Sequence, residues 1–314
     1  MQNVQGKYMS DLAIARSNRR LGQSGLKVAP IAYGMWRYAG TDVADATRKV
    51  EIALDAGMTL FDTADVYGLD SDMHFGAAEE LFGEVLAARP ALRDRMVIAS
   101  KGGIIPGTPY DSSAAYLRKA CEASLRRLKI DVIDLYQIHR PDMLSHPAEV
   151  AETLTALRTE GKIREIGLSN HTSAQIRALQ AHLDVPLATQ QPEFSAIAVE
   201  PVTNGVLDLC METGMTPLAW SPLAGGRLML EANEAATPEL ADVIITLDRL
   251  AKERGVSRTA IALAFVLAHP SAPIPIIGSQ TPVRIAEAMS ALDVTLTRAD
   301  WYAIYEAATG QPLP

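Results

Sequence analysis

Short apolar runs alternate with longer amphipathic stretches over most of the chain. Eight of the short runs are apolar nearly throughout, which is typical of strands buried on both faces of a parallel sheet. We predict strands at residues 30–36, 58–62, 96–101, 132–139, 163–169, 187–191, 216–221 and 273–278. Apolar positions at helical spacing predict helices at residues 43–56, 77–88, 112–128, 147–158, 173–181, 201–211, 238–254 and 282–292.

Eight strand–helix repeats in succession predict an α/β fold, the (β/α)8 or TIM barrel. An open, doubly wound sheet shows the same alternation, so periodicity alone does not separate the two. We favour the barrel because no G-x-G-x-x-G follows any expected strand and no G-x-x-x-x-G-K-[ST] occurs. Two additions are expected: a short hairpin at Arg19–Ala29 that plugs one end of the barrel, and extra helices at residues 257–267 and 298–308.

Composition and charge narrow the classes of protein. The chain has 314 residues, 48% of them hydrophobic, and its 29 Lys+Arg against 37 Asp+Glu give a net charge of −8. An acidic balance argues against nucleic acid as a partner, and no apolar run reaches the ~18 residues of a membrane helix. Two cysteines exclude a disulfide framework. Residues 1–17 lack the pattern of a signal peptide, so we expect a flexible leader, one barrel domain at residues 18–314 and a cytoplasmic location.

Candidate catalytic side chains follow three consecutive expected strands, where barrel active sites lie. Asp62 ends the second strand in the segment F-D-T-A-D-V-Y-G that also contains Tyr67, Lys101 ends the third and His139 ends the fourth. A tyrosine titrates near 10, and a nearby ammonium lowers that pKa, so Lys101 held by Asp62 could make Tyr67 a better acid. His139 could orient a substrate oxygen. A plain Asp62–Lys101 ion pair, a rim tyrosine and a core histidine remain alternatives.

The last third of the chain carries two candidate anion sites. The seventh expected strand ends in W-S-P-L-A-G-G-R (Trp220–Arg227), whose small residues let backbone N–H groups approach a phosphate. The eighth ends in G-S-Q-T-P-V-R, in which Thr281 could cap a helix and Arg284 adds a charge. A capped helix with an exposed arginine is the alternative. No H-E-x-x-H or nucleophile elbow occurs, so we expect no metal and no hydrolase chemistry.

Together these residues resemble the aldo-keto reductases, from the hairpin at Arg19 to the expected helix at 282–292. The F-D-T-A-x-x-Y-G segment, the lysine closing strand three and the histidine closing strand four look like the family signature. The bacterial general-oxidoreductase branch, similar to potassium-channel beta subunits, looks nearest. The resemblance implies that Tyr67 is the general acid, that Lys101 and Asp62 tune it, and that His139 positions the carbonyl of an aldehyde or ketone.

The resemblance also implies NADPH, extended across the barrel mouth and passing hydride from the nicotinamide C4. Trp220 would stack on the nicotinamide, and Arg284 would face the 2′-phosphate. Gly278 stands where many members have a lysine, so NADH use remains open. The implied cofactor-binding residues are Gly34, Met35, Trp36, Asp62, Ser169, Asn170, Gln191, Trp220, Ser221, Leu223, Ala224, Gly225, Arg227, Gly278, Ser279, Gln280, Arg284 and Glu287.

The substrate is a small carbonyl compound in this interpretation. The expected pocket consists of Trp36, Tyr67, His139 and the loop that begins at Ile104, together with the loop after Trp220 and the C-terminal tail. Its apolar walls suggest a substrate with an apolar or aromatic body. Two other functions remain open: an NADPH-binding, redox-sensing subunit with slow turnover, and isomerase or lyase chemistry through a Schiff base on Lys101. The oligomeric state is not determined by the sequence.

Overall fold

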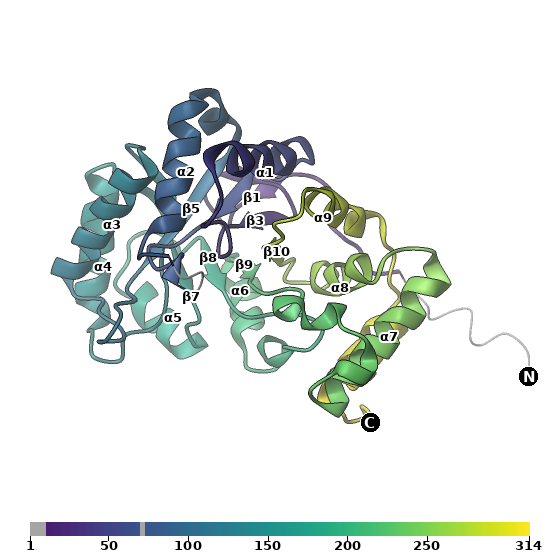
Figure 1. Cartoon of the computed structure of the whole chain (residues 1–314). Helices are drawn as coiled ribbons and strands as arrows, with labels where there is room; N and C mark the ends of the chain where they lie inside the picture. The colour runs from purple at the N-terminus through teal and green to yellow at the C-terminus, as the bar shows by residue number, and fades with distance from the viewer. Residues whose placement is uncertain (1–10, 70–72) are drawn as a thin grey trace, which may run out of the picture.

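The strands form one closed parallel barrel (Figure 1). The structure is a computed structural model that describes residues 11–69 and 73–314. The barrel strands are β3 (Ala32–Gly34), β4 (Leu60–Asp62), β5 (Val97–Gly102), β6 (Ile133–Ile138), β7 (Ile163–Ser169), β8 (Thr189–Gln191), β9 (Thr216–Ala219) and β10 (Ile274–Ile277). β10 pairs with both β9 and β3, which closes the sheet and confirms the predicted barrel. Each observed strand lies within a predicted one, except that β5 extends one residue further.

The predicted hairpin is present as β1 (Arg19–Arg20) and β2 (Lys27–Val28), which pair antiparallel. Leu21 and Val28 are fully buried and join Leu60, Ala99 and Leu135 in one apolar cluster. The hairpin therefore plugs the floor of the barrel with its own apolar side chains.

Part of the expected leader packs against the domain. The amide of Leu12 donates to the carbonyl of Leu296 at 2.8 Å, and Asp11 forms a β-bridge with Thr297. The rest of the expected leader, residues 1–10, lies outside the described residues. No helix in the described part of the chain is both long and apolar enough to cross a membrane.

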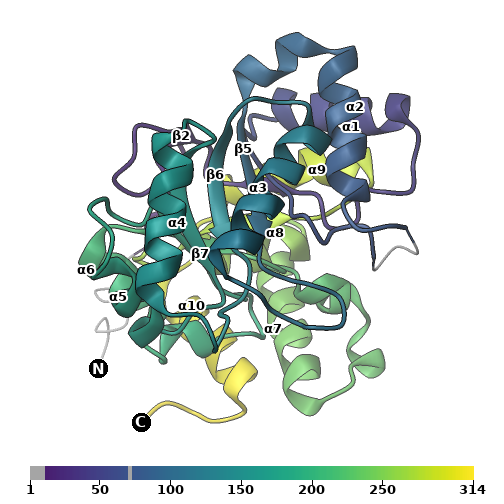
Figure 2. The ribbon, with the colours of Figure 1, turned by 90° about the vertical axis from the view of Figure 1, so that its left-hand side faces the viewer.

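The helices form a layer around the barrel (Figures 1 and 2). They are α1 (Val43–Asp55), α2 (Ala77–Ala88), α3 (Ala114–Leu128), α4 (Pro147–Thr159), α5 (Ser173–Gln180), α6 (Val206–Thr213), α7 (Pro238–Arg254), α8 (Arg258–Leu267), α9 (Pro282–Glu287) and α10 (Arg298–Thr309). Two of them differ from the predicted bounds by more than two residues. α6 begins at residue 206 because Glu200–Val202 form a separate 3₁₀ turn and Gly205 has a φ of 83°. The expected helix at 282–292 ends at Glu287 and continues as a 3₁₀ segment.

The peripheral helices are α7 and α10, whereas the sequence suggested residues 257–267 and 298–308. α7 packs along α10, and α8 packs between β10 and the outer segments. Every residue of α8 from Ala260 to Leu267 is buried, and the indole of Trp301 in α10 stacks on Phe265 with 4.8 Å between ring centroids. A helix that is apolar on all sides belongs in the interior, so α8 is the layer that covers the barrel wall.

The side chains that face the barrel interior change from apolar to polar towards the carboxyl ends of β4 and β5. On β5, Val97 and Ala99 belong to the apolar floor cluster, and Lys101 is the next residue of the same parity. On β4, Asp62 follows Leu60 in the same way. Because successive side chains of a strand point to opposite faces, these polar residues face the interior above an apolar floor, at the carboxyl ends of the strands.

Candidate active site

Lys101 is the centre of a buried polar cluster. Its ammonium donates to Asp62 Oδ2 at 2.6 Å, to the carbonyl of Thr63 at 2.9 Å and to the Tyr67 hydroxyl at 3.0 Å. These bonds use all three donors of the ammonium. Lys101 is fully buried and Asp62 nearly so. The structure therefore brings together three of the four expected catalytic side chains.

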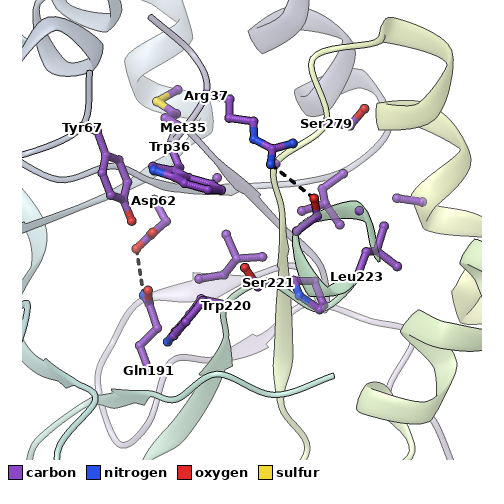
Figure 3. Close-up of a pocket in the computed structure, with 18 of the residues that line it drawn as sticks. Met35, Trp36, Arg37, Asp62, Tyr67, Gln191, Trp220, Ser221, Leu223 and Ser279 are labelled. Carbon is purple, nitrogen blue, oxygen red and sulfur yellow. Dashed lines mark hydrogen bonds between the residues drawn. The ribbon is translucent and has the colours of Figure 1, made fainter. Parts of the chain in front are cut away.

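The second oxygen of Asp62 is held by two glutamines. Oδ1 accepts from the side-chain amide of Gln191 at 3.0 Å (Figure 3). It also accepts from the side-chain amide of Gln137 at 3.1 Å, and the Gln191 amide donates in addition to Gln137 Oε1. Both glutamines are buried. Sequence reasoning missed Gln137, although its position two residues after Leu135 on an apolar strand placed it on the inner face. The carboxylate is thus fixed on both oxygens and points one of them at Lys101.

A tight turn places Tyr67. The amide of Asp65 donates to the carbonyl of Lys101 at 3.0 Å, and the amide of Tyr67 donates to that of Ala64 at 3.2 Å. Gly68 follows with a φ of 125°, and a Cβ there would lie 2.7 Å from the carbonyl oxygen of His74. Only glycine fits this position, so the Y-G pair in the sequence is a requirement of the turn.

The pKa of Tyr67 differs from the expectation. Burial raises the pKa of its phenol above the ordinary value; the Lys101 ammonium acts in the opposite direction but does not outweigh burial. The phenol is therefore protonated at neutral pH. Burial alone would lower the pKa of Lys101, but the Asp62 carboxylate and the hydrogen bonds to Asp62 and Tyr67 raise it overall. The Lys101 amine is therefore protonated at neutral pH and acts as a hydrogen-bond donor.

His139 faces Tyr67 across the site. Its imidazole lies edge-on to the phenol, with 5.7 Å between ring centroids, and its backbone amide donates to the carbonyl of Gly102. Burial, followed by the charges of Lys101 and Arg140, lowers the pKa of His139 well below its ordinary value. The imidazole is neutral near pH 7, so it can donate or accept one hydrogen bond without carrying charge.

A cavity of about 850 Å³ opens above this cluster and extends towards α9. Trp36 and Trp220 stand on opposite sides of it, with Tyr67 and Asp62 at one end and Ser279 towards the other (Figure 3). Expected cofactor residues that line it are Gly34, Met35, Trp36, Asp62, Ser169, Asn170, Gln191, Trp220, Ser221, Leu223, Gly225, Gly278, Ser279, Arg284 and Glu287. Tyr67, His139 and Ile104 of the expected substrate pocket also line it.

Other expected residues do not line the cavity. Ala224 is buried, and the Arg227 side chain turns back to donate to the carbonyl of Ala224 at 3.0 Å. The Gln280 amide donates to the Tyr33 hydroxyl at 3.3 Å and to a neighbouring carbonyl. The C-terminal tail, which was expected to contribute to the substrate pocket, does not line this cavity: no described residue after Ala288 does.

The chain after Trp220 has the backbone shape expected of an anion site. Ser221, Ala224, Gly225 and Gly226 all have φ between 47° and 100°. A Cβ at Gly225 or Gly226 would meet no protein atom within 4 Å, so within the protein it is the left-handed backbone that favours glycine at both positions. Thr281 occupies the N-cap position of α9, but its side chain makes no capping bond, contrary to the expectation.

Polar groups beside Trp220 bind one another. The Trp220 indole N–H donates to Asn170 Oδ1 at 3.0 Å, and Asn170 Nδ2 donates to Ser169 Oγ at 2.8 Å and to the carbonyl of His139 at 3.2 Å. The amide hydrogens of Asn170 and Gln191 are therefore in use. What these residues still offer a ligand is acceptor capacity at Asn170 Oδ1 and Gln191 Oε1.

Three arginines of the cavity wall were missed by sequence reasoning. Arg37 reaches from the turn after β3 to donate to the carbonyl of Gly225 at 3.3 Å, and so bridges the cavity (Figure 3). Arg258 forms two hydrogen bonds with Asp248. Arg140 follows His139 directly. Lone arginines outside a motif give no signal in one sequence, although position 140 beside a candidate residue could have been considered.

A closed barrel with a Tyr–Lys–Asp cluster and a neighbouring histidine at the carboxyl ends of its strands is the arrangement of a carbonyl oxidoreductase. Comparison with known proteins agrees: residues 30–309 match the Aldo/keto reductase family, and the chain belongs to it. It is 53% identical to 6-dehydroglucose reductase of Novosphingobium aromaticivorans, over 98% of this chain and 100% of that one.

Further similarities support this assignment. The chain is 37% identical to 6-dehydroglucose reductase of Agrobacterium fabrum, over 91% of this chain and 96% of the relative. It is 34% identical to oxidoreductase YdhF of Escherichia coli, over 94% and 98%. The solved glycerol dehydrogenase of Gluconobacter oxydans superposes with a TM-score of 0.80 at 27% identity, covering 97% of each chain. The protein is therefore an aldo-keto reductase, an oxidoreductase that acts on small carbonyl compounds.

Proposed function

We propose that this protein reduces an aldehyde or ketone to an alcohol with NADPH, and that Tyr67 is the general acid. The observation that carries the proposal is the 3.0 Å hydrogen bond from the buried Lys101 ammonium to the Tyr67 hydroxyl, at the floor of a cavity. The ammonium occupies one lone pair of the phenol oxygen, so the phenol proton is directed elsewhere. In this geometry the proton is available to an oxygen bound in the cavity.

Each residue has a defined task in the reaction. Tyr67 gives its proton to the carbonyl oxygen, and the phenolate that forms is stabilised by the Lys101 ammonium already in contact. Asp62 holds the ammonium at 2.6 Å, and the two glutamines hold Asp62. The neutral His139 donates a hydrogen bond to the same oxygen and fixes its direction. Burial raises the pKa of the Tyr67 phenol, so the phenol is protonated at neutral pH and can donate its proton.

The cavity fits a dinucleotide. The cavity extends from Tyr67 to Arg284, which supplies a cation at the far end. The indole of Trp220 lines it between these two residues, and left-handed backbone follows Trp220 along the chain. Asn170 Oδ1 and Gln191 Oε1 have acceptor capacity for a carboxamide N–H, and Arg284 would bind a 2′-phosphate. When bound, the reduced nicotinamide supplies the hydride for the carbonyl carbon.

Schiff-base chemistry at Lys101 is disfavoured by the same contacts. A nucleophilic amine needs an unprotonated nitrogen, and the Asp62 carboxylate together with the hydrogen bonds raises the pKa of Lys101 despite its burial. All three N–H groups already have acceptors. Lys101 acts as a fixed charge in our proposal.

A carbonyl panel tests the proposal. The purified protein is mixed with NADPH and aliphatic, aromatic and hydroxylated aldehydes, and loss of reduced-cofactor absorbance is followed. We include hydroxylated aldehydes because two relatives are named 6-dehydroglucose reductase. Turnover of at least one aldehyde with NADPH is expected, with slower turnover at equal NADH. Tight NADPH binding without turnover of any carbonyl would instead identify a redox-sensing subunit.

A further inference from the structure

Arg140 is a cationic side chain on the wall of the reaction cavity with no task in the scheme above. It follows His139 at the end of β6, is half-buried, and lines the same cavity as Tyr67. Its guanidinium carbon lies 5.8 Å from the centroid of the Trp220 ring. Its positive charge lowers the pKa of both Tyr67 and His139, although burial is the larger influence on each. Arg140 therefore lies close to where the carbonyl reacts.

The guanidinium of Arg140 is unlike those of its neighbours. Arg37 donates to Gly225 and Arg258 to Asp248, each in a fixed position. Within residues 11–69 and 73–314, Arg140 has neither a hydrogen bond nor an ion pair to any side chain or backbone atom. The planar fork of N–H donors on this cavity-lining residue therefore has no acceptor from the protein in the described structure. No nitrogen of Arg140 is among the buried atoms that lack a partner, so water can reach the fork, and a ligand that supplies oxygen atoms can take the place of that water.

The surrounding charge favours a neutral oxygen ligand over an anion. Glu193, two residues after the end of β8, is close enough for the Arg140 charge to act on its carboxyl; burial raises the pKa of Glu193, and Arg227 and Arg140 lower it. The positive field of Arg140 is therefore partly compensated when Glu193 is ionised. A hydroxyl oxygen needs only a hydrogen-bond donor from the guanidinium, whereas a carboxylate depends on its net positive charge and gains less where that charge is partly compensated.

We propose, on the basis of the proposed function, that Arg140 determines substrate specificity by donating hydrogen bonds to hydroxyl oxygens on the carbons next to the reacting carbonyl. The preferred substrates are then hydroxylated aldehydes, such as open-chain sugar aldehydes. Arg140 takes no part in proton transfer. The cavity wall at this point is polar, which differs from the apolar substrate body that the sequence suggested.

Matched substrates test the proposal. Glyceraldehyde and propanal have three carbons and differ in hydroxyl groups, and succinate semialdehyde and butanal have four carbons and differ in a carboxylate. With NADPH saturating, Arg140→Met is expected to lower kcat/KM for glyceraldehyde by about 10- to 100-fold, because hydrogen bonds from a charged donor are lost. For propanal, which has no hydroxyl group, kcat/KM should fall by less than about threefold. Arg140→Lys should restore only part of the loss, because it keeps the charge without the fork.

The controls separate other roles of Arg140. Arg37→Met removes another cavity arginine, which is committed to Gly225, and should change glyceraldehyde and propanal turnover alike. The Kd for NADPH, measured by tryptophan fluorescence quenching, should be unchanged by Arg140→Met. Equal losses on glyceraldehyde and propanal, a loss confined to succinate semialdehyde, or weakened NADPH binding would each overturn the inference. If the unmodified enzyme reduces no aldehyde, the proposed function itself fails, which is a different result.

Discussion

Replacement of Tyr67 by phenylalanine removes one oxygen from the Lys101 cluster and nothing else. The variant loses the proton donor and one of three acceptors of the ammonium, which keeps Asp62 at 2.6 Å and the Thr63 carbonyl at 2.9 Å. The ring contact with Lys101, at 4.7 Å from nitrogen to ring centroid, is preserved. The change therefore isolates the hydroxyl from the charge arrangement around it.

The expected magnitudes for activity and stability differ. A positioned general acid contributes about 10²- to 10⁴-fold, which corresponds to about 3–5 kcal/mol in the activation free energy. An N–H left without an acceptor costs ~1–3 kcal/mol, but Tyr67 lines the cavity and water can replace the lost oxygen. We therefore expect the free energy of unfolding to fall by about 1 kcal/mol, with kcat lower by at least about 100-fold.

The assay follows NADPH absorbance with the best aldehyde of the panel, together with NADPH binding and thermal unfolding. NADPH binding should stay within about twofold, since the nicotinamide contacts that we propose come from other residues. Tyr302→Phe, on the exposed side of α10, is the matched control and should leave kcat unchanged. A Tyr67→Phe variant that turns over at the normal rate would refute the assignment of the general acid.

Three further predictions follow from charge and titration. Arg284→Ala should raise KM for NADPH by about 10- to 100-fold and that for NADH by less than about threefold, measured by steady-state kinetics, because only NADPH carries the 2′-phosphate. Carbonyl reduction should be independent of pH around neutrality and decline only in the alkaline range, because burial raises the pKa of Tyr67 and lowers that of His139; an inflection near pH 6.5 would contradict this. Asp65 is fully buried with neither oxygen hydrogen-bonded in the described structure, and burial raises its pKa well above 3.8. The folded state thus holds a proton that the unfolded state releases, wild-type stability falls as pH rises above about 4, and Asp65→Asn should gain in relative Tm as the pH rises from about 4 towards neutrality. A constant Tm difference over that range would refute it.

The fold was predictable because its signal is local and repeated. Eight apolar runs separated by amphipathic stretches require a parallel sheet covered by helices, and the observed strands follow them closely. Closure itself, with β10 pairing β3, is a long-range property that the pattern permits but does not require. The choice between α7 and α8 as the peripheral helix depended on packing against α10, which periodicity does not encode.

The candidate site was predictable at residues that lie at the carboxyl end of a strand. Asp62, Lys101 and His139 each lie at or next to the carboxyl end of a largely apolar strand, and the barrel brings such positions to one face. Gln137 was missed because one polar residue inside a strand has no motif. The sign of the Tyr67 pKa shift was also missed, since burial and charge oppose each other and only the folded environment decides which is larger.

The sequence by itself determined the repeat of buried strands and covering helices and the identity of the four candidate groups near the strand ends, because these depend on local pattern. The tertiary structure alone decided that Lys101 has three acceptors, that Arg227 faces its own loop and that Arg140 faces the cavity. Arginine side chains are long and can satisfy their donors in many directions, so where they point depends on atoms far away in the chain.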